Sequence, residues 1–295
     1  MPAPSSSARP WSLGLPLWGQ ANFTGVLYPP GTRPREQLAE YARIFDAVEG
    51  NTTFYHVPSE GTVARWAELT PPTFRFFFKF PKAVTHERLL GRGAGEEGAR
   101  FLERTAPLGP RRGPCMVQLP PAFGPDRLPR LDAFLAAVPD DVACAVEVRH
   151  PHWFRRGPAG ELEAVLADHG AERVIIDTRG MRSGDPEDPD VRAAAHEKPD
   201  VPVWTGALSP QPLVRYVGHP TPAVNAAFLA HWAERIAAWV AEGRRPAFFM
   251  HCPENRHSPG LARRLDRLVR TRLEAPPLPA FPRVVESQAP QLSLL

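Results

Sequence analysis

Residues 74–80 read Phe-Arg-Phe-Phe-Phe-Lys-Phe, and their alternation predicts a β-strand with two different faces. Successive side chains of a strand point to opposite sides, so the phenylalanines at even positions share one face, and the other face carries Arg75, Phe77 and Lys79. A face made only of phenylalanine is suited to pack under helices. The opposite face, with a charge at each end, must then point into the interior of a barrel.

Further apolar runs read as strands, and helix-like patterns lie between most of them. The predicted strands cover 12–15, 47–49, 74–80, 115–119, 142–148, 173–177, 213–217 and 247–251. The predicted helices cover 35–45, 59–69, 96–106, 127–138, 160–169, 223–242 and 259–273. Ser59 and Ser258 are suited to cap helix N-termini, and His169-Gly170 is a typical helix end. Alternating strands and helices indicate parallel strands joined by crossover helices.

The predicted fold is α/β, a single TIM (β/α)8 barrel over residues 12–273. A flexible N-terminus, 1–11, precedes it, and a proline-rich tail, 274–295, follows it. An open doubly wound sheet is the alternative, although no G-x-G-x-x-G motif follows a strand. A long loop with one short helical piece, 191–196, replaces the sixth helix. It lies on the face where barrel active sites occur, either as a lid or as a tolerated insertion.

Composition excludes several classes of protein. Of the 295 residues, 43% are apolar and 23% are charged, which excludes wholesale disorder, and no apolar run is long enough to span a membrane. The first ten residues resemble no signal peptide, so we expect a cytoplasmic protein. Three scattered cysteines exclude a disulfide scaffold. The net charge is only +3, yet two of the three lysines, Lys79 and Lys82, stand at one strand end.

Alternation in the other strands predicts a polar interior at their carboxyl ends. The residues expected to point inward are Glu49, Asn51, Lys79, Gln118, Glu147, Arg149, Asp177, Arg215 and His251. The acids and bases among them cancel in number, so one interpretation is a self-satisfied salt-bridge network. The other is a site for a small polar or anionic ligand, because active sites of this fold collect at that end.

Several chemistries fit these residues. A lysine that faces a carboxylate suits proton transfer or a Schiff base. Glu49 and Glu147 could instead serve as the two carboxylates of a glycosidase. A divalent metal held by Glu49, Glu147 and Asp177 is a further alternative, but Lys79 and the arginines would repel it. We expect no metal and no tightly bound organic cofactor.

The motifs together resemble one family, the YecE-like proteins, domain of unknown function 72. The stretches that carry the resemblance are EGNTTFY at 49–55, KFP at 79–81, TH at 85–86, QLPPAFG at 118–124, VEVRHP at 146–151 and VIIDT at 174–178. The resemblance covers about 14–265 and implies a (β/α)8 barrel in the bacterial cytoplasm without an established activity. Its recurrent polar positions match Glu49, Asn51, Tyr55, Lys79, His86, Gln118, Glu147, Arg149, His150 and Asp177. Many relatives carry Asn-Asn where this chain has His251-Cys252.

The last five residues, Gln-Leu-Ser-Leu-Leu, follow the proline-rich stretch. They are similar to the pentapeptide by which bacterial replication and repair proteins bind the sliding clamp, with Leu295 in place of phenylalanine. A glutamine anchor and apolar side chains that fill a pocket would give the contacts Gln291, Leu292, Leu294 and Leu295. An unremarkable apolar end is the other interpretation.

The sequence therefore predicts an enzyme that acts on a small polar or phosphate-bearing substrate at the carboxyl end of the barrel by Lys/Glu acid–base chemistry. Lys79, Glu147, Glu49 and Asp177 are the candidate catalytic groups. The candidate substrate-binding residues are Asn51, Tyr55, His86, Gln118, Arg149, His150, Trp153, Arg215 and His251. The alternatives are a nucleic-acid-associated repair or nuclease-like protein recruited to the sliding clamp, and a non-catalytic binding module. No membrane partner is expected.

Overall fold

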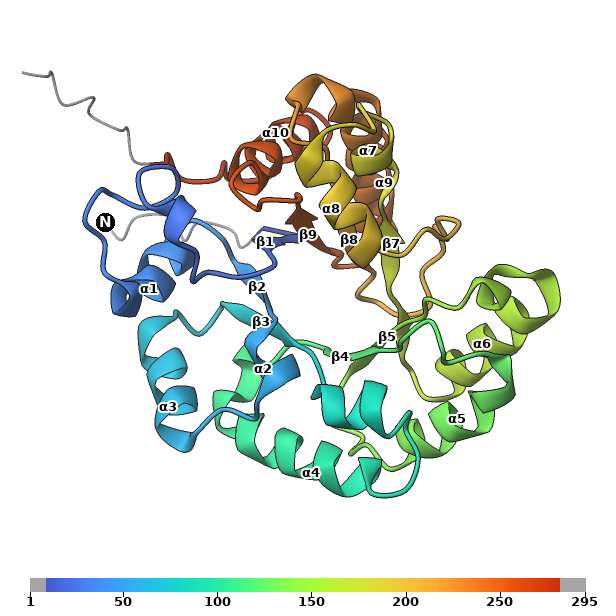
Figure 1. Ribbon diagram of the computed structural model, residues 1–295. Helices are drawn as coiled ribbons and strands as arrows, with labels where there is room; N and C mark the ends of the chain where they lie inside the picture. The colour runs from blue at the N-terminus through green and yellow to red at the C-terminus, as the bar shows by residue number, and fades with distance from the viewer. Residues whose placement is uncertain (1–8, 282–295) are drawn as a thin grey trace, which may run out of the picture.

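The computed structural model describes residues 9–281 and consists of parallel strands with helices around them (Figure 1). The strands are β1 (Ser12–Leu15), β2 (Ala47–Gly50), β3 (Arg75–Phe78), β4 (Cys115–Gln118), β5 (Cys144–Glu147), β6 (Glu172–Arg173), β7 (Ile175–Asp177), β8 (Leu213–Val217) and β9 (Ala247–His251). They form a six-stranded parallel sheet in the order β3-β2-β1-β9-β8-β7 and a three-stranded parallel sheet in the order β4-β5-β6. The fold is therefore mixed α/β with two parallel sheets.

Backbone contacts connect the two sheets. Between β3 and β4, the amide of Gly113 donates to the Phe76 carbonyl at 2.9 Å, and the amide of Phe80 donates to the Met116 carbonyl at 3.0 Å. At the other junction, β6 and β7 are separated only by Val174, whose amide donates to the Val146 carbonyl of β5 at 2.9 Å. The segment predicted as one strand over 173–177 therefore leaves one sheet and enters the other.

The helices match the predicted pattern in most places. They are α1 (Gln37–Ala42), α2 (Thr52–Tyr55), α3 (Glu60–Leu69), α4 (Ala94–Thr105), α5 (Leu128–Ala136), α6 (Arg156–Asp168), α7 (Arg179–Arg182), α8 (Pro189–Glu197), α9 (Ala226–Ala241) and α10 (Ser258–Arg270). The Ser59 hydroxyl accepts from the Thr62 amide at 3.2 Å, which confirms the predicted cap of α3. Gly170, at φ +60°, follows α6 as predicted, because glycine adopts the left-handed conformation without a steric penalty.

Two predictions about helices need correction. Ser258 does not cap α10 but is its first residue, after His257, and Pro259 follows as the second helical residue. The segment expected to be a long loop in place of the sixth helix contains two helices, α7 and α8. The helix α8 begins at Pro189 because the Asp188 carboxylate accepts from the amides of Asp190 and Val191, a cap that the short 191–196 prediction missed.

The strand β3 and its flanking residues have the predicted faces. The phenylalanines Phe74, Phe76, Phe78 and Phe80 belong to the large core between strands and helices. On the opposite side, Phe77 belongs to a small inner core with residues of six other strands or strand junctions, including Met116, Ala145 and Phe249. Lys79 follows Phe77 by two residues, so the polar site begins directly above this inner core.

Both ends of the described chain pack against the fold. The Arg9 guanidinium lies 4.5 Å from the centre of the buried Trp11 ring, so the packed part begins before Ser12. After α10 the chain contains no helix or strand as far as residue 281, and the Leu278 amide donates to Asp266 at 3.2 Å. Between residues 9 and 281, no helix has the length and apolar character needed to cross a lipid bilayer.

Candidate functional site

A cavity of about 600 Å³ lies at the carboxyl ends of the strands. Its walls come from the ends of β2, β3, β4, β8 and β9, the segment after β5, and α8. The lining residues include Asn51, Tyr55, Lys79, Gln118, Arg149, Asp190, Glu197, Lys198, Arg215, His251 and Glu254. The structure thus brings seven of the predicted polar residues to one hollow.

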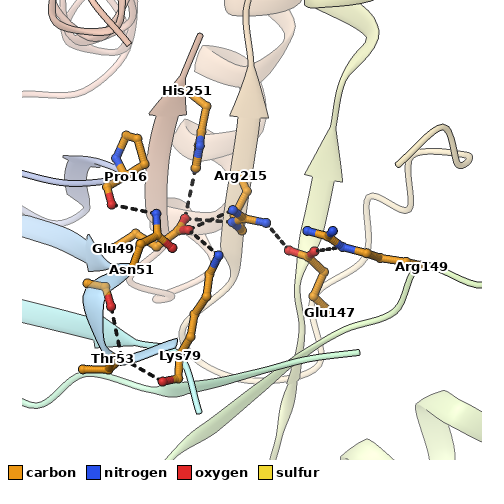
Figure 2. Close-up of polar contacts among 10 residues, drawn as sticks. Pro16, Glu49, Asn51, Thr53, Lys79, Glu147, Arg149, Arg215 and His251 are labelled. Carbon is orange, nitrogen blue, oxygen red and sulfur yellow. Dashed lines mark hydrogen bonds and ion pairs between the residues drawn. The ribbon is translucent and has the colours of Figure 1, made fainter. Parts of the chain in front are cut away.

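Arg215, on β8, is the centre of the ionic contacts beneath this cavity (Figure 2). Its Nε and one Nη donate to both carboxylate oxygens of Glu49, on β2, at 2.7 and 2.8 Å. Its other Nη donates to Glu147, on β5. The planar guanidinium carries N–H groups in a fixed fork, which lets one arginine hold two carboxylates in set positions.

Each glutamate has further donors. Glu49 contacts the Lys79 ammonium at 3.1 Å and the His251 Nε2 at 3.0 Å. Glu147 accepts from the Arg149 Nε at 2.6 Å. Figure 2 shows the resulting chain of contacts from Lys79 through the two glutamates to Arg149. Every carboxylate oxygen of the pair is therefore bonded to at least one cation.

The two carboxylates lie behind the cations and do not reach the cavity surface. Glu49 and Glu147 are both 0% exposed, and neither lines the cavity. Burial alone would raise the pKa of Glu147, but Arg215, Arg149 and Lys79 outweigh it and hold this pKa at about 2. The same balance of burial against Arg215, Lys79 and His251 keeps the pKa of Glu49 well below its ordinary value. Both groups are carboxylates at neutral pH, and the groups above them on the cavity floor are N–H donors. The acids that do line the cavity, Asp190, Glu197 and Glu254, come from α8 and from the segment after β9.

Lys79 occupies a special position in this set. Burial and the neighbouring Arg215 lower the pKa of its ammonium to about 8, against the opposite pull of the two glutamates. Thr53, in α2, fixes the backbone there, because its hydroxyl donates to the Lys79 carbonyl at 2.8 Å. An amine with a pKa near neutrality can give up and take back a proton far more readily than an ordinary lysine.

Two side-chain amides lie next to the cations. The Asn51 amide nitrogen donates to the Pro16 carbonyl at 2.8 Å, which fixes the orientation of the amide. The Asn51 Oδ1 and the Gln118 Oε1 are buried and accept no hydrogen bond from any residue in 9–281. These oxygens are acceptors without donors in a region otherwise rich in donors.

Of the remaining predicted residues, Tyr55 lines the cavity and is 70% exposed. His86 lies within a π-helix, Ala83–Glu87, and its ring contacts Phe54, another lining residue, with centroids 5.0 Å apart. Burial and then Arg149 lower the pKa of His86 to about 4, so its ring is neutral at pH 7. His150 caps a short helix after β5 and does not line the cavity.

Trp153 and Asp177 lie elsewhere, contrary to prediction. The Trp153 ring is buried, and its Nε1 donates to the Phe123 carbonyl at 2.8 Å, which makes it part of the outer core. Asp177 accepts from Trp232 of α9 at 2.8 Å and from Arg179. Val174 points inward, and because side chains alternate along a strand, Asp177, three residues later, points outward. It pairs in register with Tyr216, which also points outward. It therefore belongs to the contact between sheet and helix.

Lys198, the last of the three lysines, lines the cavity from the end of α8, although it was not among the predicted site residues. No residue of the described chain forms an ion pair with its ammonium at 4.0 Å or less. Burial, and then Arg215, lowers its pKa. The rarity of lysine in this arginine-rich chain was the signal that could have found it.

The residues in 9–281 do not gather the ligands of a metal ion. No three histidine, cysteine, aspartate or glutamate side chains among them meet in a suitable arrangement. The proposed trio does not form, because Asp177 lies outside the cavity and both glutamates are bonded to cations. The clamp-like pentapeptide, 291–295, lies outside the described residues.

Comparisons with known proteins place the chain in one family. The model of a family described as "Protein of unknown function DUF72" matches residues 12–284. The UPF0759 protein YecE of Escherichia coli K12 is 36% identical over 92% of this chain and 97% of its own length. Crystal structures of DUF72 family proteins from Enterococcus faecalis and Thermotoga maritima both align with a TM-score of 0.67. They are 18% and 21% identical, cover 91% and 88% of this chain, and are each covered to 98%.

Proposed function

We propose that this chain, which belongs to the DUF72 family of proteins of unknown function, binds the anionic group of a small polar substrate in its cavity and acts on it through Lys79. The anion would be a phosphate or a carboxylate held by Lys79, Arg149 and Arg215. One observation carries the proposal: cations from different strands converge on one floor, and their carboxylate partners are buried behind them.

The charges favour an anion over a self-sufficient network. Three cations, Lys79, Arg149 and Arg215, face two carboxylates, Glu49 and Glu147, so one positive charge is in excess at neutral pH. His251 adds no charge there, because burial lowers its pKa to about 4 despite its contact with Glu49. Lys198 adds another cation at the end of α8, where Asp190 and Glu197 also line the cavity, so the excess of positive charge belongs to the floor. The terminal nitrogens of Arg149 donate to no residue in 9–281 and are available to a ligand.

In this proposal the two glutamates orient the cations and do not act as acid and base. Their low pKa and complete burial oppose a proton-transfer role, and they equally oppose a glycosidase pair, which needs both carboxylates beside the substrate. Lys79 is the group suited to proton transfer, since its pKa of about 8 lies near neutrality and it lines the cavity.

The proposal also takes the two sheets to be parts of one closed (β/α)8 barrel. The bridges from β3 to β4 and the passage of the chain from β6 to β7 at Val174 support this closure. The location of the cavity supports it as well, because the active sites of such barrels lie at the carboxyl ends of the strands.

Calorimetric titration with inorganic phosphate tests the binding step. Lys79→Met should weaken phosphate binding by about tenfold or more, since a charged hydrogen bond of about 1.5–3 kcal/mol is lost. Lys82→Met is the matched control, because Lys82 is exposed, lies three residues away and does not line the cavity. Equal affinities of the two variants would refute the role of Lys79. Binding without turnover of any phosphate ester or carboxylate would support a binding module instead of an enzyme.

A further inference from the structure

We propose that the ligand of this cavity carries hydroxyl groups beside its anionic group, as a phosphorylated sugar or polyol does. This inference rests on the proposed anion site and names the class of substrate that the site takes. The observation that carries it is independent of the cations: two buried amide oxygens, Asn51 Oδ1 and Gln118 Oε1, stand without donors among residues 9–281.

Buried acceptors in native proteins are nearly always hydrogen-bonded, so each exception needs an explanation. The Asn51 amide cannot turn over to exchange its oxygen and nitrogen, because the nitrogen donates to the Pro16 carbonyl at 2.8 Å (Figure 2). Both residues line the one cavity that also holds the cations. A ligand that places donors on these oxygens would complete the hydrogen bonding of the site.

The two acceptors lie on either side of Lys79 in the strand order. Asn51 follows Glu49 by two residues at the end of β2. Gln118 ends β4, directly in register with Glu147 on β5. The strand β3, which Lys79 directly follows, pairs with β2, and Lys79 itself bridges to Met116 of β4, so Lys79 lies between the strand ends that carry the two amides. A ligand anchored by its phosphate on the floor would carry donor groups within one or two bonds of the anchor.

The neighbouring charges decide which donor fits. Although Asp190, Glu197 and Glu254 also line the cavity, an ammonium group at the amide oxygens is disfavoured, because Lys79, Arg149 and Arg215 on the floor would repel it. A fully ionised phosphate or carboxylate has no proton to donate. A hydroxyl group is neutral, donates one hydrogen bond to an amide oxygen and can accept another from the Lys79 ammonium. Hydroxyl groups next to a phosphate are the pattern of sugar and polyol phosphates.

A matched pair of small phosphates tests the inference. Glycerol 3-phosphate and n-propyl phosphate have the same three-carbon chain and the same charged group, and differ only in two hydroxyls. Calorimetric titration of the full chain should show that glycerol 3-phosphate binds about tenfold tighter or better, the sum of two ordinary hydrogen bonds. Gln118→Met, which removes the amide at similar length, should reduce this ratio.

The outcomes separate this inference from the proposal beneath it. Equal affinity of the unaltered chain for both phosphates would overturn the hydroxyl inference and leave the anion site intact. Failure of both compounds and of inorganic phosphate to bind would overturn the anion site, and the inference with it. The comparison of ligands on the unaltered chain decides the matter even where Gln118→Met unfolds.

Discussion

Arg215 holds both buried glutamates, so its replacement is the sharpest test of how the site is built. Arg215→Met keeps an unbranched side chain but removes all the N–H groups that contact Glu49 and Glu147. Loss of one partner from a buried ion pair costs about 3–5 kcal/mol. Lys79 and Arg149 each still hold one carboxylate. We therefore expect the free energy of unfolding to fall by an amount at the lower end of this range, about 3 kcal/mol at pH 7.

The cost of Arg215→Met should depend on pH in a defined direction. In the native chain the pKa of Glu147 is about 2, below its ordinary 4.5, so the ionised group stabilises the fold above pH 4.5 and loses this effect as the pH falls toward 2. Without Arg215, burial raises the pKa of both glutamates, and they take up protons on mild acidification. The difference in unfolding free energy should therefore be larger at pH 7 than at pH 4.

Urea unfolding followed by tryptophan fluorescence measures both effects. The control is Arg245→Met, because Arg245 is exposed at the opposite end of β9 and forms no ion pair with residues 9–281. It should change the unfolding free energy by less than about 0.5 kcal/mol. The double variant Arg215→Met, Glu147→Gln should recover part of the loss, since one uncompensated carboxylate is gone. The reasoning is refuted if Arg215→Met costs no more than the control, or the same at both pH values.

Three further variants test other parts of the structure. Gly14→Ala should destabilise the chain by roughly 1–3 kcal/mol, because a Cβ there would lie 2.2 Å from the Ala47 carbonyl oxygen. Gly61→Ala is the control and should not lower stability, because a Cβ there meets no atom within 4 Å. Equal melting temperatures of the two variants in thermal unfolding would contradict this prediction. Asp177→Asn should lower the melting temperature but leave phosphate affinity unchanged, because Asp177 contacts Trp232 and Arg179 outside the cavity. A tenfold lower affinity for phosphate in the calorimetric titration would contradict this placement of Asp177. Deletion of 291–295 should abolish any binding to a bacterial sliding clamp in surface plasmon resonance, and binding that persists would refute the pentapeptide prediction.

The sequence predicted the inward side chains wherever one face of a strand was marked by its neighbours. In β3 the phenylalanines identify the outer face, so Phe77 and Lys79 are assigned inward, as the structure has them. Residues 174–176 are all apolar, so alternation does not distinguish the two faces of this strand. The prediction therefore placed Asp177 on the wrong face. Register between neighbouring strands decides the face there, and register is a tertiary property.

The sequence could not place residues that reach the site from irregular segments. Lys198 arrives from the end of α8, in a region expected to be mostly loop, and its position depends on the packing of α8 against Met181 of α7 and Val217 of β8. Trp153 was taken for a rim residue because exposed and buried tryptophans look alike in sequence. Its hydrogen bond to Phe123, 30 residues away, is a contact that no local pattern encodes.

A salt-bridge network and a ligand site were competing interpretations of the sequence, but in the function we propose one depends on the other. Cations gathered on one floor repel each other, and desolvation makes each of them costly to bury. The fully buried Glu49 and Glu147 offset both costs, because they bind the cations from behind. A buried ionic set of this kind is not the most stable way to fill a core, since apolar residues of similar volume often do better. What it supplies is fixed direction: each cation is held on its inner side and keeps donors for the cavity. Removal of a glutamate should therefore weaken anion binding through misplaced donors, although the glutamates never touch the anion.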